Sequence, residues 1–264
     1  MRTLLSCALL SVFVGCSSSN ATGPTARDPE RMSESEYDVA RDLWLRRNQP
    51  REALAHALKA IDLDEGNAEA AHLVALLYLD FCSRGPTDCR LSEAEKQARL
   101  ALRNKPDFRE AKNTLAVVLI HEKRYADAIA VLKPLTEDIL YQTPENAWGN
   151  LGWAYLEQGS FDLAIDALKH SVAAQPLFCV GSYRLGIAFE HKQEFTSALD
   201  AFTRALETEA PGCNSLQDAF ASRARVRMKL GDSAAARTDL ERCVALSGKT
   251  KPGKECSSML QNFK

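Results

Sequence analysis

The chain has 264 residues, of which 33 are basic and 35 acidic, so its formal net charge at pH 7 is −2. A charge this close to zero argues against the strongly basic surface that nucleic-acid binding requires, and we expect no nucleic-acid partner.

The first 15 residues have the order of a secretory signal. Arg2 is followed by an apolar run that ends at Val14, and then by Gly15 and Cys16. The run is too short to span a bilayer as a permanent helix. Its ending, in place of an Ala-x-Ala site, resembles a bacterial lipoprotein signal, in which the cysteine thiol is acylated and becomes the new amino terminus. The sequence therefore predicts a signal peptide at 1–15 and lipidation of Cys16; the alternative is an ordinary cleaved signal with an incidental cysteine.

The lipid anchor predicts a location. A cysteine that carries several acyl chains holds a protein firmly in one leaflet. In lipoproteins of this kind an aspartate after the cysteine marks retention at the inner membrane, and here that residue is Ser17. We expect a protein anchored by outer-membrane lipid at the periplasmic face. Residues 16–32, rich in Ser, Thr, Gly and Pro and without periodicity, are typical of a flexible tether.

Residues 145–178 carry the pattern of a helical hairpin. Large apolar residues stand where they fill the space between two antiparallel helices, small residues stand where the helices approach, and a proline ends the second helix. These positions hold Trp148, Leu151, Gly152, Tyr155, Phe161, Ala164, Leu168 and Pro176. This is the tetratricopeptide pattern. One such hairpin cannot bury its own apolar face, so it predicts stacked neighbours.

The neighbours are present on both sides. The second unit fits if an extra loop from Cys82 to Cys89 separates its helices, the last unit is weaker, and the first is a capping unit. Within 33–264 the five further units are 34–66, 67–106, 109–142, 179–212 and 217–250, followed by a C-terminal capping tail. The sequence therefore predicts an all-α fold, a right-handed superhelix (α-solenoid) of six tetratricopeptide repeats, with no room for a separate catalytic domain.

Cysteine usage fits an exported chain. Without Cys7, removed with the signal, and Cys16, six cysteines remain, and six allow 15 pairings. Their positions in the repeats favour three pairs, within one inserted loop, at the same end of adjacent hairpins, and between the last helix and the tail: Cys82–Cys89, Cys179–Cys213 and Cys243–Cys256. A zinc site is the alternative, but CxxC spacing is absent and no histidine is near in sequence.

No motif in the chain predicts catalysis. There is no HExxH and no serine in a GxSxG elbow, and the carboxylates are spread along helix faces as solvated charge. The histidines also occupy polar positions and are expected to be solvated: His56, His72, His121, His170 and His191. We expect no enzymatic activity, no metal and no cofactor.

The first helix of each hairpin predicts where a partner binds, because in stacks of this type it lines the concave groove. The predicted groove consists of Asn113, Val117, Asn146, Asn150, Trp153, Tyr183, Arg184 and Ile187, and the same positions add Ile120, His121, Leu156 and Glu190. Aromatic, amide and guanidinium groups together suit a peptide or an amphipathic helix. For Trp153 the alternative is packing between repeats, because groove and packing positions differ by one residue of phase.

A lipoprotein signal followed by six repeats, with the run YQTPENAWGNLGWAYLEQGSFDLAIDAL at its centre, resembles the pilotins of type IV pili, the Tgl/PilF/PilW family. The resemblance covers essentially the whole mature chain, and its specificity lies in the combination, since many unrelated proteins share the repeat. It implies that the protein binds monomers of the type IV pilus secretin and promotes their delivery to, or oligomerisation in, the outer membrane. The alternative is a lipid-anchored adaptor that recruits peptidoglycan hydrolases or assists the assembly of outer-membrane barrels.

Overall fold

The computed structural model describes residues 28–85 and 87–261, so Cys16 and most of the expected tether lie outside the described residues. The described part contains thirteen α-helices, one short 3-10 helix and no strand. Their bounds are α1 Pro29–Leu45, α2 Pro50–Leu63, α3 Ala68–Arg84, α4 Leu91–Asn104, α5 Arg109–His121, α6 Tyr125–Thr136, α7 Pro144–Gln158, α8 Phe161–Ala174, α9 Cys179–His191, α10 Phe195–Glu207, η1 Cys213–Ser215, α11 Gln217–Lys229, α12 Ser233–Leu246 and α13 Lys251–Gln261. None of these helices is both long and apolar enough to cross a membrane.

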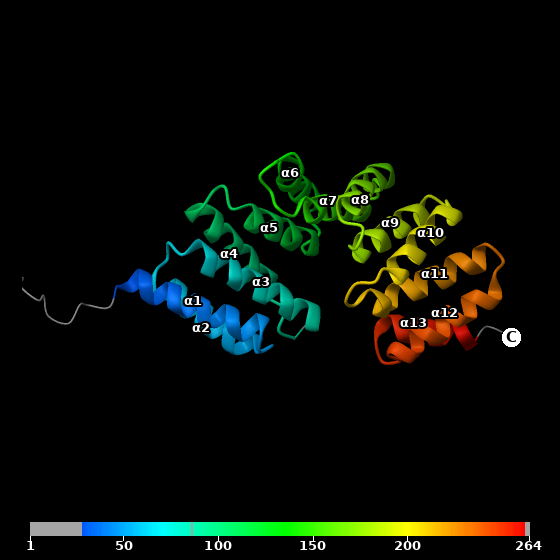
Figure 1. Cartoon of the computed structure of the whole chain (residues 1–264), viewed down its shortest axis with the longest axis horizontal. Coiled ribbons are helices and arrows are strands. Elements are labelled where there is room, and N and C mark those ends of the chain that lie inside the picture. The colour runs from blue at the N-terminus through cyan, green and yellow to red at the C-terminus, as the bar shows by residue number, and fades with distance from the viewer. Residues whose placement is uncertain (1–27, 86, 262–264) are drawn as a thin grey trace, which may run out of the picture.

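The helices pack as a series of hairpins. Each odd-numbered helix from α1 to α11 contacts the helix that follows it, and it also contacts the next odd-numbered helix. The hairpins follow an arc in which α6 lies outside α5 and α10 lies outside α9 (Figure 1). We call the surface that the odd-numbered helices present to the inside of this arc the inner face. The structure confirms the predicted all-α solenoid of tetratricopeptide repeats.

Two glycines explain how closely the paired helices approach. A Cβ atom added to Gly152 on α7 would lie 2.5 Å from Cγ of Leu168 on α8. At Gly186 on α9 it would lie 2.5 Å from the ring of Phe202 on α10. Both of these partners are fully buried. The glycine of the repeat pattern is therefore required by the packing, because interiors are too dense to absorb an extra methyl group.

The first helix begins earlier than expected. Pro29 opens α1, so residues 29–32, expected in the tether, form its first turn. The Asp28 side chain accepts a hydrogen bond from the backbone N–H of Glu30 at 3.2 Å, and proline is favourable at a first helical position, where its missing N–H costs nothing. The serine that follows this turn, Ser33, is buried and donates to the carbonyl of Ala60 on α2 at 2.7 Å. A polar, proline-containing stretch is here a helix start.

Within the described ranges, three disulfides are present, one in the loop between α3 and α4 and two in the C-terminal half. They join Cys82 to Cys89, Cys179 to Cys213, and Cys243 to Cys256, which are the pairs expected from the repeat positions. The first closes the loop between α3 and α4, and the second ties α9 to the 3-10 helix before α11. The third fastens α13, the capping tail, to α12.

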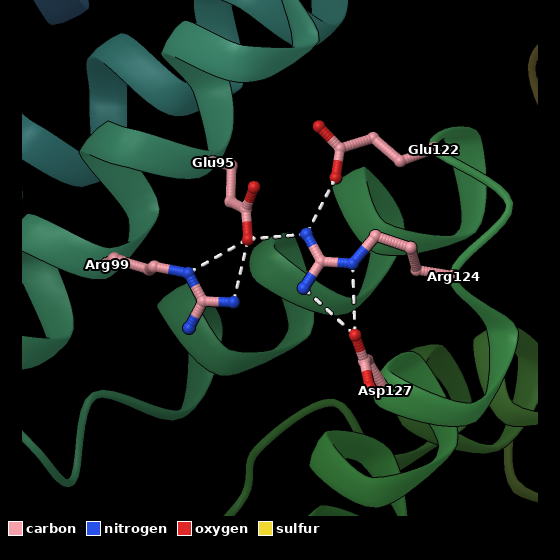
Figure 2. A network of polar contacts seen from close by, with 5 residues as sticks. All are labelled: Glu95, Arg99, Glu122, Arg124 and Asp127. Atoms are coloured by element: carbon pink, nitrogen blue, oxygen red, sulfur yellow. Dashed lines mark hydrogen bonds and ion pairs between the residues drawn. The ribbon is translucent and has the colours of Figure 1, made fainter.

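An ion-pair network joins the second hairpin to the third. Arg124, just before α6, forms ion pairs with Glu95 on α4 at 2.9 Å, with Glu122 at 3.1 Å and with Asp127 at 2.9 Å. Arg99 forms an ion pair with the same Glu95 at 2.7 Å (Figure 2). Burial alone would raise the pKa of Glu95, but the hydrogen bonds from Arg99 and Arg124 outweigh it and lower that pKa. Exposed pairs contribute little stability individually, so the network mainly fixes how the two hairpins meet.

Two expectations about solvated polar groups are wrong. Asp239 on α12 is 2% exposed and forms ion pairs with Arg223 and Arg227, each at 2.7 Å. These two arginines are four residues apart and therefore lie on the same side of α11.

His72 on α3 is the second of these residues, and it shares a hydrogen bond with Thr114 on α5 at 2.9 Å. Burial lowers the pKa of His72 to about 4, so its imidazole is neutral at pH 7.

Candidate functional site

A chain of hydrogen bonds crosses three neighbouring odd-numbered helices on the inner face. Asn150 on α7 donates from Nδ2 to Oδ1 of Asn113 on α5 at 3.0 Å. Arg184 on α9 donates from Nη1 to Oδ1 of Asn150 and to the carbonyl of Gly149, each at 3.3 Å. The structure thus brings together three residues of the predicted groove, Asn113, Asn150 and Arg184, one from each of three hairpins.

Trp153 lies beside this chain and is part of the same cluster. The Cζ atom of Arg184 lies 4.3 Å from the centroid of the Trp153 ring, within the range of a cation–π contact. His121, at the end of α5, meets the same ring edge-on with centroids 5.1 Å apart, and Trp153 Nε1 donates to Glu157 at 3.2 Å. Trp153 is half-buried, so it combines contacts between repeats with a surface open to a partner.

The electrostatics of the cluster depend on one cation. Desolvation lowers the pKa of Arg184 to about 10, so the guanidinium remains charged at neutral pH. Partial burial, and then the charge of Arg184, lower the pKa of His121, which leaves that imidazole neutral. The cluster therefore combines the Arg184 cation and the acidic Glu157 side chain with amides, a carbonyl and an aromatic face.

A cleft of about 620 Å³ lies between the C-terminal halves of α9 and α11 and the start of α10. The cleft combines apolar, acidic and basic side chains: Ile187, Glu190, His191, Gln193, Phe195, Arg225 and Lys229. Arg225 is bonded to Glu190 at 3.1 Å and to Glu255 at 3.0 Å. Ile187, another predicted groove residue, lines this cleft and lies about one helical turn from Arg184 on α9.

The other predicted groove residues have mixed surroundings. Val117 and Asn146 are half-buried on α5 and α7 and take no part in the hydrogen-bonded chain. Tyr183 packs toward Phe202, with ring centroids 6.0 Å apart, and burial raises the pKa of its phenol. Ile120 is only 2% exposed and belongs to the central core, so its assignment to the groove is wrong. A shift of one residue in helical phase separates it from the exposed His121.

Two basic residues of this surface, Arg225 and Lys229, were not predicted. They lie on α11, the first helix of the repeat that matches the pattern least well. The alternating sequence RARVRMK places basic residues along that helix and is the signal that could have identified them. Within the two described ranges no group of three or more His, Cys, Asp and Glu side chains is arranged to hold a metal ion.

The sequence matches one family profile, that of the tetratricopeptide repeat, over residues 90–136, 139–177 and 150–212. No curated protein matches the chain in sequence.

Solved structures share the architecture. PilW, described as a widely conserved type IV pilus biogenesis factor, is 24% identical with a TM-score of 0.71, and the match covers 84% of this chain and 96% of PilW. PilF of Pseudomonas aeruginosa is 16% identical with a TM-score of 0.68, covering 88% of this chain and 99% of PilF. YrrB, a tetratricopeptide protein with an unusual peptide-binding site, is 15% identical with a TM-score of 0.50, covering 76% of this chain and 97% of YrrB. The chain has the fold of PilW and PilF over almost their full length.

Proposed function

We propose that this chain is a lipid-anchored pilotin at the periplasmic face of the outer membrane, where it binds subunits of the type IV pilus secretin and promotes their assembly. The observation that carries the proposal is the cluster of Asn113, Asn150, Trp153 and Arg184 on the inner face. These side chains come from three hairpins and are already held in place, so a partner would bind without ordering them first.

Several features support the compartment and the partner. The signal sequence that ends at Cys16 is of the lipoprotein type and favours attachment to a membrane. The disulfides of the described residues suit an oxidising compartment. The match to PilW and PilF over 96% and 99% of their lengths favours a role in type IV pilus biogenesis. In this proposal the inner face holds a secretin segment before the ring assembles, and the acyl chains bring the complex to the membrane.

Deletion of the gene tests the proposal. We expect secretin multimers that resist heat and detergent to disappear while secretin monomer remains. Complementation with Trp153→Ala should restore multimers poorly, because hot spots of binding surfaces are enriched in tryptophan. Asp166→Ala, at an exposed position of α8, should restore them fully. Normal multimers in the deletion strain would refute the proposal, as would co-purification of a peptidoglycan hydrolase or a barrel-assembly component in place of the secretin.

A further inference from the structure

We propose that the inner face binds an acidic side chain within a continuous peptide segment, with the carboxylate on Arg184 and a neighbouring apolar side chain in the cleft lined by Ile187 and Phe195. This inference deepens the proposed function and rests on it for the identity of the partner protein. The chemistry of the bound segment comes from the site itself.

The direction of the hydrogen bonds makes the site a donor surface. A guanidinium can only donate, so Oδ1 of Asn150 must face Arg184. The Nδ2 group of Asn150 then donates to Oδ1 of Asn113. The Nδ2 group of Asn113 is left without an acceptor among the residues that the structure describes. The Arg184 cation thus orients both amides, so that the series of hydrogen bonds ends at Asn113 in N–H groups without an acceptor.

Arg184 itself has donors to spare. Both of its hydrogen bonds come from Nη1, which leaves Nε and Nη2 without acceptors in the described part of the chain. These nitrogens are not sealed from solvent, because the buried side-chain atoms without a partner in that part are Gln97 Oε1 and Ser182 Oγ. Arg184 is half-buried, so its unused donors keep some contact with solvent and lack a protein acceptor.

No carboxylate of the described chain forms an ion pair with Arg184. Other inner-face and neighbouring arginines differ, since Arg225 is paired with Glu190 and Arg223 with Asp239. Glu157 acts on Arg184 through its charge without forming an ion pair with it, and it accepts a hydrogen bond from Trp153. A partly desolvated guanidinium whose free edge carries two parallel donors matches a carboxylate in both charge and geometry.

The surroundings of Arg184 favour an internal acidic residue over a chain end. On one side the donor surface continues to Asn113 on α5. On the other side the cleft of about 620 Å³ begins at Ile187 and extends to Lys229 on α11. Lys229 forms no ion pair within the described residues. A bound segment can therefore extend past Arg184 in both directions, with an apolar residue in the cleft.

An array of random 12-residue peptides, acetylated at the N terminus and amidated at the C terminus, tests this chemistry on the purified mature protein. We expect bound peptides to be enriched in Asp or Glu next to an aliphatic residue. Changing that Asp to Asn, or Glu to Gln, should weaken binding about tenfold or more, the effect of losing a charge-assisted hydrogen bond. In Arg184→Gln the acidic and amide peptides should bind alike. Arg103→Gln, at an exposed position of α4, should keep the full difference.

Three results would overturn the inference. They are a bound set without acidic residues, an acidic-to-amide difference that Arg184→Gln leaves unchanged, and binding only by peptides with a free C-terminal carboxylate. The peptide substitutions are made against the unmodified protein, so the test does not depend on whether the variant folds. If the secretin fails to co-purify while the acid-dependent binding persists, the proposal that the partner is the secretin is refuted, and the proposal that the site binds an acidic side chain is supported. If the secretin co-purifies equally well with Arg184→Gln, the proposal that Arg184 binds an acidic side chain of the partner is refuted.

Discussion

Replacing Gly152 with alanine should destabilise the central hairpin. The new Cβ would lie 2.5 Å from Cγ of Leu168, 2.9 Å from its Cδ2 and 3.3 Å from the backbone oxygen of Ala164. Leu168 is fully buried, and densely packed protein interiors leave such a side chain little room to move. Overpacking of a core costs about 1–3 kcal/mol, and contacts this short place the cost in the upper part of that range. Alanine recovers about 1 kcal/mol through its higher helix propensity. We expect a net loss of about 1–2 kcal/mol.

Urea and thermal denaturation followed by circular dichroism measure this loss. For a chain of this size it corresponds to a fall in Tm of roughly 3–6 °C. Gly248→Ala is the matched control, because its Cβ would meet nothing closer than Val244 Cγ1 at 3.9 Å, and it should change stability by less than about 0.5 kcal/mol. In a Leu168→Ala background, Gly152→Ala should become neutral or stabilising. Wild-type stability in the single variant, or an undiminished loss in that background, would refute the packing explanation.

Three further predictions concern charge, cross-links and the anchor. The pKa of His72 falls from 6.5 to about 4 on burial, so the unfolded chain binds more protons in that interval. Stability should be complete above about pH 6.5 and fall by about 3 kcal/mol toward pH 4, and His72→Gln should flatten this part of a urea-denaturation pH profile. Removing Cys179–Cys213, which are 34 residues apart, by replacing both with Ala should cost about 4 kcal/mol in chemical denaturation if chain entropy dominates. Cys16→Ala should move the protein out of the outer-membrane fraction and leave its helical circular dichroism unchanged, since α1 begins only at Pro29.

The solenoid was predictable because the steric code of each hairpin is local. Gly152 and Leu168 are close in sequence and contact each other within one hairpin, so the repeat pattern alone predicts this contact. The central cluster was also predictable, because position along the first helix sets the direction of Asn113, Asn150 and Arg184. The same regularity places corresponding positions of successive hairpins side by side.

The remaining features depend on phase and on contacts between elements. Ile120 was placed on the groove although it is core, because one residue of phase separates the two surfaces. The cleft at Lys229 required the weak last repeat to be positioned against α9. The burial of Asp239 arises from its pairing across two helices. Such pairings cannot be predicted from a single sequence, because Asp239 and its arginines, considered one at a time, are each expected to be solvent-exposed charges.

Site-specific photo-crosslinking on the inner face tests the central claim most directly. A photoreactive amino acid at position 146 lies within the predicted groove and leaves the hydrogen bonds among Asn113, Asn150 and Arg184 in place. The same amino acid at the exposed Asp166 on α8 serves as the control. We predict a covalent adduct with the secretin in living cells from position 146 and none from position 166. The absence of a secretin adduct at position 146, or equal adducts at both positions, would contradict binding through the inner face.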